Sequence, residues 1–190
     1  MWASAAGVSK GEALLKGIKH APCVLHIATH GYFCEQSDAN SMANPLLRSG
    51  LILAGANRTI GHLDEPTSSS EDGILTALEA SGLNLGGTDL VVLSACQTGL
   101  GDVQSGEGVF GLRRAFQLAG ARSVVVSLFE IPDEQAFQLM KLFYTNWLEG
   151  QSKPTALRHA SLSRLERCRR NNESENPLFW GGFVVVGKPD

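Results

Sequence analysis

Residues 90–99 read LVVLSACQTG, an apolar run that stops at a serine, an alanine and a cysteine before a glycine. A run of this kind is typical of a strand buried on both faces of a parallel sheet, and a turn follows its carboxyl end. Ligands of open α/β sheets bind beyond the carboxyl ends of the strands. The stretch therefore predicts that Cys96 presents its thiol at the mouth of a sheet.

A second stretch of the same shape lies earlier in the chain. Residues 24–31 read VLHIATHG, which predicts a strand over 23–29 and a turn that begins with His30 and Gly31. If the two strands are neighbours, His30 and Cys96 lie within a few ångströms, although 66 positions separate them. An imidazole lowers the pKa of a neighbouring thiol and can later protonate a leaving amine. The pair predicts a nucleophilic dyad, with the backbone N–H groups of Gly31 and Cys96 as oxyanion donors.

Structural roles are the alternative for the same residues. A cysteine at a strand end is most often a small buried apolar residue, and a histidine on an apolar strand most often a core residue. By alternation His26 shares a face with His30 and is an alternative base, but its place inside the strand favours a core role. We interpret Cys23, Cys34 and Cys168 as structural, because none has a comparable setting.

The composition excludes several classes of protein. The chain has 190 residues, a net charge of −3 and 4 cysteines without a CxxC pair, so we expect no nucleic-acid partner, no metal and no cofactor. It shows no secretory signal and no apolar run of about 20 residues, so we expect a cytoplasmic protein without a membrane partner. We interpret one local basic cluster as a solvated helix face; its members are Arg164, Arg167, Arg169 and Arg170.

Apolar strand patterns alternate with helical patterns along the chain, which predicts an α/β fold with a mostly parallel sheet covered on both faces. We expect strands at 23–29, 50–54, 89–95, 123–129 and 183–186. We expect helices following Ser9, at 74–80, at 109–119, and in the stretches that begin at Asp133 and Ser152. Polar segments at 35–44 and 57–72 are predicted loops.

A glycine pattern offers a different function. Gly106, Gly108 and Gly111 match a dinucleotide-binding fingerprint that opens a helix, and Glu130 follows the next strand. The glycines begin ten residues after Cys96 instead of directly after the strand, which weakens the match. A dinucleotide-binding domain is therefore the less favoured alternative.

The order of the motifs resembles the CHAT domain, a bacterial branch of the caspase-like, clan CD cysteine peptidases that is related to separase and often joined to tetratricopeptide repeats. The resemblance rests on HIATHG at 26–31, DGILTA at 72–77, LVVLSACQTGLG at 90–101, GEGVFGLRRAF at 106–116, AGARSVVVSL at 119–128 and NPLFWGGFVVVG at 176–187. By this likeness His30 is the base and Cys96 the nucleophile of an endopeptidase that hydrolyses a protein or peptide substrate. A fused or associated sensor or repeat region outside this chain would regulate it.

The resemblance also implies a fold. It is a three-layer sandwich whose caspase-like sheet has the order 2-1-3-4-5-6, with strands three to six at 23–29, 89–95, 123–129 and 183–186. The first two strands would then be missing, so residues 23–190 would form the C-terminal part of a larger peptidase domain. Residues 1–22 would be an N-terminal helix preceded by a remnant outside the domain. The strand that carries His30 would be an exposed edge, covered by a partner.

Substrate preference is expected to depend on Ser94, Ser127, Phe129, Glu130 and Asp133. Ser94 stands where metacaspase-like and legumain-like relatives have an aspartate that pairs with a basic P1 residue. Glu130 and Asp133, like Asp102 and Glu107, can line a pocket for lysine or arginine, although capping and solvation are their ordinary roles. Residues 127–130 are the expected edge for a substrate strand.

Two further positions depart from the family pattern. Phe129 stands where the family usually has tryptophan, and Gly181 with Gly182 stands where alanine commonly follows the tryptophan. The remaining alternative is a catalytically silent CHAT scaffold or protein-interaction module, because both dyad residues can persist in a dormant enzyme.

Overall fold

The computed structural model describes residues 2–4, 11–33, 44–56, 72–95 and 107–190. The strands in these parts are β1 (Trp2–Ser4), β2 (Val24–Phe33), β3 (Ser49–Ile52), β4 (Ile74–Thr76), β5 (Leu90–Ala95), β6 (Ser123–Ser127) and β7 (Phe183–Gly187). The α-helices are α1 (Gly11–Lys16), α3 (Ala77–Ser81), α4 (Glu107–Leu118), α5 (Asp133–Leu148) and α6 (Lys153–Arg170). Two 3-10 turns, η1 (Pro45–Leu47) and η2 (Pro177–Phe179), complete the described elements.

The strands form one sheet in the order β4-β3-β2-β5-β6-β7, with β1 also paired to β2. The centre is parallel, since β2 pairs in parallel with β1 and β5, and β5 with β6. The outer strands β3, β4 and β7 run antiparallel to their neighbours. The predicted neighbours β2, β5, β6 and β7 lie side by side as expected, which confirms the α/β class.

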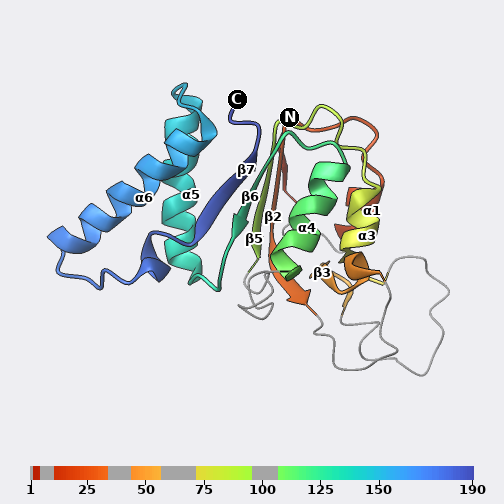
Figure 1. Ribbon diagram of the computed structural model, residues 1–190, viewed down its shortest axis with the longest axis horizontal. Coiled ribbons are helices and arrows are strands. Elements are labelled where there is room, and N and C mark those ends of the chain that lie inside the picture. Colours follow the sequence, from red (N-terminus) through yellow and green to blue (C-terminus); the bar gives the residue numbers. More distant parts are fainter. Residues whose placement is uncertain (1, 5–10, 34–43, 57–71, 96–106) are drawn as a thin grey trace.

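Helices cover both faces of the sheet, so the domain has three layers (Figure 1). One hydrophobic core lies between the sheet and α1, α3 and α4, and a second lies between the sheet and α5 and α6. Strand β5 supplies both cores by alternation: Val91 and Leu93 belong to the first, and Leu90 and Val92 to the second. The continuously apolar strand pattern therefore reflects burial on two sides.

Strand β2 is longer than predicted and is not an edge. Its first residues pair with β1, and residues 30–33 leave β5 and pair antiparallel with β3, where His30 lies opposite Ile52. The expected turn at His30 and the expected exposed edge are both wrong. The backbone stays extended past Thr29 because β3 provides its hydrogen-bond partners there.

The segment predicted as one helix over 74–80 is in fact a short strand followed by a short helix. Thr76 ends β4 and caps α3: its hydroxyl accepts a hydrogen bond from the backbone N–H of Glu79 at 3.2 Å. The Glu79 carboxylate accepts one in return from the backbone N–H of Thr76 at 2.9 Å. This reciprocal capping box sets the start of the helix at Ala77.

A charged network ties α1 to this capped helix. Glu12 is only 2% exposed; its carboxylate accepts hydrogen bonds from the backbone N–H of Gly73 at 2.7 Å and from Lys16 Nζ at 2.5 Å. Lys16 also reaches Glu79 at 2.7 Å. Burial by itself would raise the pKa of Glu79, but hydrogen bonds from Lys16 and Thr76 lower it overall.

Residues before the predicted boundary at residue 22 contribute to this architecture, since β1 joins the sheet and Leu15 of α1 lies in the first core. The boundary itself stays a prediction. Within the described residues, every helix is too short or too polar to cross a membrane.

Candidate functional site at the carboxyl ends of β2 and β5

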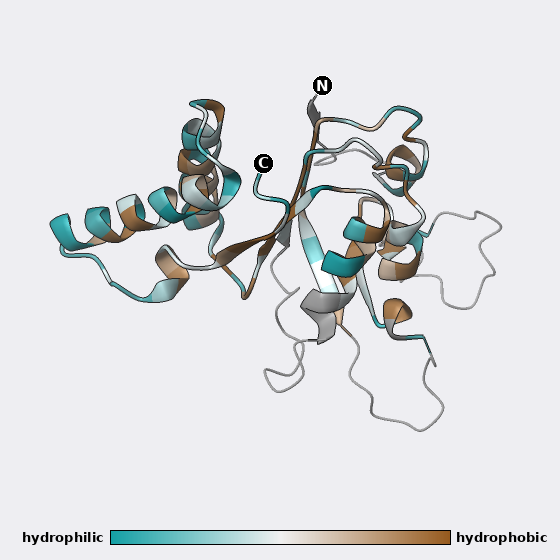
Figure 2. Ribbon diagram, turned by 45° about the horizontal axis from the view of Figure 1, so that its top comes forward, coloured by the Kyte–Doolittle hydropathy of each residue, from teal (hydrophilic) through white to brown (hydrophobic). Residues whose placement is uncertain are grey.

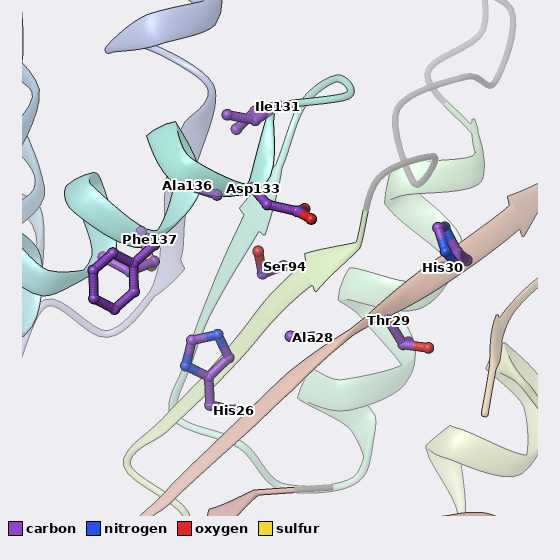
Figure 3. A pocket seen from close by; sticks show the side chains of 10 residues that line it. His26, Ala28, Thr29, His30, Ser94, Ile131, Asp133, Ala136 and Phe137 are labelled. Atoms are coloured by element: carbon purple, nitrogen blue, oxygen red, sulfur yellow. The ribbon is translucent and has the colours of Figure 1, made fainter. Parts of the chain in front are cut away.

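A pocket of about 450 Å³ lies between the carboxyl ends of β2 and β5 and the first turns of α5 (Figure 3). It is lined by His26, Ala28, Thr29, His30, Ser94, Ile131, Asp133, Ala136, Phe137 and Met140. Its place agrees with the rule that α/β sheets bind ligands beyond the carboxyl ends of their strands.

Strand alternation explains which side chains reach this pocket. Val24 on β2 and Val92 on β5 pack into the core beneath α5 and α6. The same face continues along β2 to His26, Ala28 and His30, and along β5 to Ser94. The side chains thus change from apolar to polar where each strand emerges from the core.

His30 is exposed at the pocket margin, on the same face of the sheet as Ser94. One residue earlier, Thr29 lies opposite Ala95, and its hydroxyl donates a hydrogen bond to the carbonyl of Ile52. Gly31 is buried inside β2 and lies opposite Leu51. Cys96 lies outside the described residues, so its pairing with His30 stays a prediction.

His26 forms part of the pocket wall and is held in place by α5. Its Nδ1 is hydrogen-bonded to the Tyr144 hydroxyl at 3.1 Å, and the two ring centroids lie 5.8 Å apart. Burial lowers the pKa of His26 and raises the pKa of Tyr144. Partial burial and the contact with Tyr144 of α5 fit His26 as a wall residue.

The opposite wall comes from the start of α5. Asp133 is the first residue of the helix and is exposed, with Pro132 in the capping position. Ala136, Phe137 and Met140 follow it at helical spacing and also line the pocket. Figure 3 shows Asp133 extending its carboxylate into the space between α5 and the ends of the two strands. It is the one acidic residue among the described lining residues.

The predicted substrate-binding residues separate into two groups. Ser94 and Asp133 line the pocket. Ser127 is 3% exposed and already pairs with β7, while Phe129 packs against the core beneath α5. Glu130 is exposed, and none of Ser127, Phe129 and Glu130 is a lining residue.

The glycine pair that departs from the family pattern has a local explanation. A Cβ atom on Gly182 would lie 2.2 Å from Ile131 Cδ1 and 3.0 Å from Phe129 Cε2. For a Cβ atom on Gly181, the nearest contact would be the carbonyl oxygen of Pro177 at 3.5 Å, which is an ordinary van der Waals distance. Gly182 therefore lets Ile131 pack where it forms the pocket wall, whereas position 181 has room for alanine.

One glycine of the predicted dinucleotide-binding fingerprint is explained by packing. Gly111 lies in α4 against β3, and a Cβ atom there would be 2.5 Å from Ser49 Oγ. Close approach of helix and strand thus accounts for this glycine without a ligand. Gly106 lies outside the described residues. No group of three or more His, Cys, Asp or Glu side chains in the described part of the chain is arranged to hold a metal ion.

Sequence reasoning did not assign several lining residues to the site. Ala136 and Met140 line the pocket, although their helical spacing in the sequence indicates no more than an apolar helix face. Phe137 is 60% exposed and has no pattern that separates it from a surface aromatic residue. Tyr144 gave no signal of its contact with His26, because 118 residues lie between the two positions.

Comparison with known proteins identifies the family. The CHAT domain family matches residues 5–188. Tetratricopeptide repeat protein 28 from human is 32% identical over 193 residues, and its mouse counterpart is 27% identical over 197 residues. The alignments cover 95% and 93% of this chain but only 8% and 7% of the relatives, so the chain spans less than a tenth of their length.

Both relatives are mammalian, and the expected bacterial origin stays a prediction. The matched region includes all the strands from β2 to β7, the pocket and the glycine pair. The chain therefore belongs to the CHAT domain family, which is caspase-like.

Proposed function

We propose that this chain is a caspase-like cysteine endopeptidase module in which Cys96 is the nucleophile and His30 the general base. The observation that carries the proposal is the register of β2 and β5. Their parallel pairing runs without interruption from Val24 opposite Leu90 to Thr29 opposite Ala95. His30 follows Thr29 directly in the sequence, and Cys96 follows Ala95.

Covalent geometry limits how far apart these two residues can be. Paired strands lie about 4.8 Å apart, and each further residue adds about 3.8 Å, so the two Cα atoms are separated by no more than about 12 Å. Cys96 also follows Ser94 by two positions, which is the repeat of side chains on one strand face. Both considerations favour a thiol that faces the pocket margin where His30 lies.

The chemistry follows from these assignments. His30 accepts the Cys96 thiol proton, and the thiolate attacks the carbonyl carbon of the scissile peptide bond. Backbone N–H groups of Gly31 and Cys96 stabilise the resulting oxyanion. The intermediate collapses, the carbon–nitrogen bond breaks, and His30 returns the proton to the leaving amine. Water then hydrolyses the thioester and releases the second product and the free thiol.

The pocket supports a basic P1 residue. Its apolar walls, among them Ala136 and Met140, suit the alkyl stem of lysine or arginine, and Asp133 offers a carboxylate for the cationic end. Ser94 on β5 has no charge to pair with a basic P1 side chain. In this proposal Asp133, at the start of α5, provides the carboxylate instead. A protein substrate with exposed lysine or arginine fits best.

Regulation by a larger assembly is the second part of the proposal. The human and mouse relatives are named for tetratricopeptide repeats and are more than ten times longer than the matched region. We infer that this domain acts in the cytoplasm beside a repeat or sensor region that controls access to the pocket.

The test combines cleavage with covalent labelling. Peptides with arginine, lysine, leucine or aspartate at P1 are incubated with the protein and with its Cys96→Ala, His30→Gln and Asp133→Asn variants. We expect Cys96→Ala and His30→Gln to lose roughly a thousandfold of the activity. Asp133→Asn should lose mainly the preference for basic P1 residues. The exposed thiol of Cys23 provides the matched control, and Cys23→Ala should cleave like the parent.

Unchanged cleavage by Cys96→Ala would refute the nucleophile assignment. A parent protein that neither cleaves any peptide nor forms a mass-detectable adduct at Cys96 with an arginyl electrophile would favour the silent scaffold instead.

A further inference from the structure

A second pocket, distinct from the candidate active site, lies between the two outer helices. It has a volume of about 330 Å³ and shares no lining residue with the first pocket. Figure 1 shows α5 and α6 packed side by side on the same face of the sheet. The polar residues that line it are Gln138 and Lys141 from α5 and Ser163, Arg164, Arg167 and Arg170 from α6.

The charge in this pocket is of one sign. Arg164, Arg167 and Arg170 recur every three residues and therefore form one stripe along α6, which Lys141 faces from α5. No aspartate or glutamate is among the described lining residues. Figure 2 shows that α6 is largely hydrophilic along its length.

Arg164 distinguishes this pocket from an ordinary solvated helix face. It is only 6% exposed, so the interpretation of the arginine cluster as solvated is wrong at this position. Its Nε is buried without a hydrogen-bond partner, and the side chain makes no ion pair with any described residue. Burying a charge without a partner is costly, and proteins normally pair such groups.

Two other cations nearby show the usual behaviour. Lys153 at the start of α6 is 1% exposed and pairs with Asp89 at 3.1 Å. Arg169, which does not line the pocket, pairs with Glu175 at 2.9 Å. Two basic residues of α6 outside the pocket thus have acidic partners, whereas no acidic residue is among the described residues that line the pocket.

We propose that this pocket binds the polyphosphate group of a small molecule. One carboxylate would neutralise a single cation, whereas a chain of phosphates carries several charges and accepts many hydrogen bonds in a compact volume. Guanidinium groups bind phosphate oxygens in pairs with matched geometry, and three of them converge here. The bound anion would supply the partner that Arg164 lacks. The inference does not depend on the proposed peptidase activity.

The test is calorimetric titration of inorganic tripolyphosphate, and separately of ATP, into the protein at low salt. We expect saturable binding of one tripolyphosphate per chain. Arg164→Gln and Arg167→Gln should each weaken binding about tenfold or more, since each removes charge-assisted hydrogen bonds. Arg167 is exposed, so its variant remains informative if Arg164→Gln does not fold. Arg158→Gln is the matched control: it lies exposed on the same helix, does not line the pocket, and should bind like the parent.

The two probes identify the source of the phosphate. Equal affinities for tripolyphosphate and ATP mean that the phosphate chain alone is recognised, and tighter binding of ATP means that a nucleotide is the ligand. Absence of saturable binding overturns the proposal, as does an equal loss in Arg158→Gln, which would indicate diffuse attraction by the basic helix. A polyglutamate peptide that binds through Arg164 and Arg167 while tripolyphosphate does not would also overturn it, and would indicate an acidic protein partner.

Discussion

Two sets of buried charged or titratable side chains, one on each face of the sheet, differ in the partners that they have. On the side of α1, α3 and α4, Glu12, Lys16 and Glu79 form a connected network whose buried carboxylate is bonded to a backbone N–H and an ammonium group. On the side of α5 and α6, His26 lines one pocket and Arg164 lines another with an unpartnered Nε. The charged groups of the first set have partners within the fold, whereas Arg164 keeps a buried Nε without one beside a pocket.

This difference separates structural from ligand-binding polarity. A buried polar group that has its partners stabilises the fold and has no capacity left for a ligand. A polar group that borders a cavity without a protein partner retains that capacity. By this criterion Arg164 marks the second pocket as a ligand site, and the charged network on the opposite face has a structural role.

The largest effect expected on stability tests the charged network. Replacing Glu12 with alanine leaves the Gly73 N–H buried without an acceptor and removes one of the two carboxylate partners of Lys16. We expect the free energy of unfolding to fall by about 3 kcal/mol in urea denaturation. Glu149→Ala, at an exposed position, should change it by less than about 0.5 kcal/mol. A similarly small loss for Glu12→Ala would mean that the charged network contributes little to stability.

A smaller effect is expected at the wall of the first pocket. Gly182→Ala forces Ile131 out of its place, and such overpacking costs about 2 kcal/mol. Because the displaced side chain enters the pocket, binding or cleavage of peptides should weaken as well. Gly181→Ala is the matched control and should be nearly neutral, since its Cβ meets only ordinary contacts. Equal tolerance of both alanines would show that Ile131 has room to move.

The smallest effect is a pH dependence from His26. Burial lowers the pKa of His26 in the folded protein. Below about pH 6.5 the imidazole is therefore protonated more readily in the unfolded chain than in the folded one, which favours unfolding. Stability should therefore fall as the pH drops below that value, by at most about 1.4 kcal/mol per pH unit, and should be level above it. Thermal unfolding between pH 7.5 and 5.5 measures this. The fall should be shallower in His26→Gln but unchanged in His159→Gln, whose imidazole is exposed. An identical pH profile in all three proteins would contradict the assignment of His26 as a buried neutral group.

Much of the candidate site follows from local sequence. Apolar runs that end in polar residues located the point where the parallel pairing of β2 and β5 ends, at Thr29 and Ala95, although β2 itself continues to Phe33. Alternation assigned His26 and His30 to one face. The neighbours within the sheet followed from the family resemblance. The extension of β2 and the short strand β4 could not be predicted in this way, because their hydrogen bonds go to β3, whose contribution depends on which segments meet in space.

By itself, the sequence determined the alternation of helices and strands, the family, and which residues stand where the parallel pairing of β2 and β5 ends. Only the tertiary structure decided what covers each face. Arg164 looks like a surface residue in the sequence, yet α5 buries it beside a pocket, and Gly182 is required because Ile131 arrives from a distant segment. The physical reason is that periodicity reports which way a side chain points, whereas burial and partnership depend on the element packed against it.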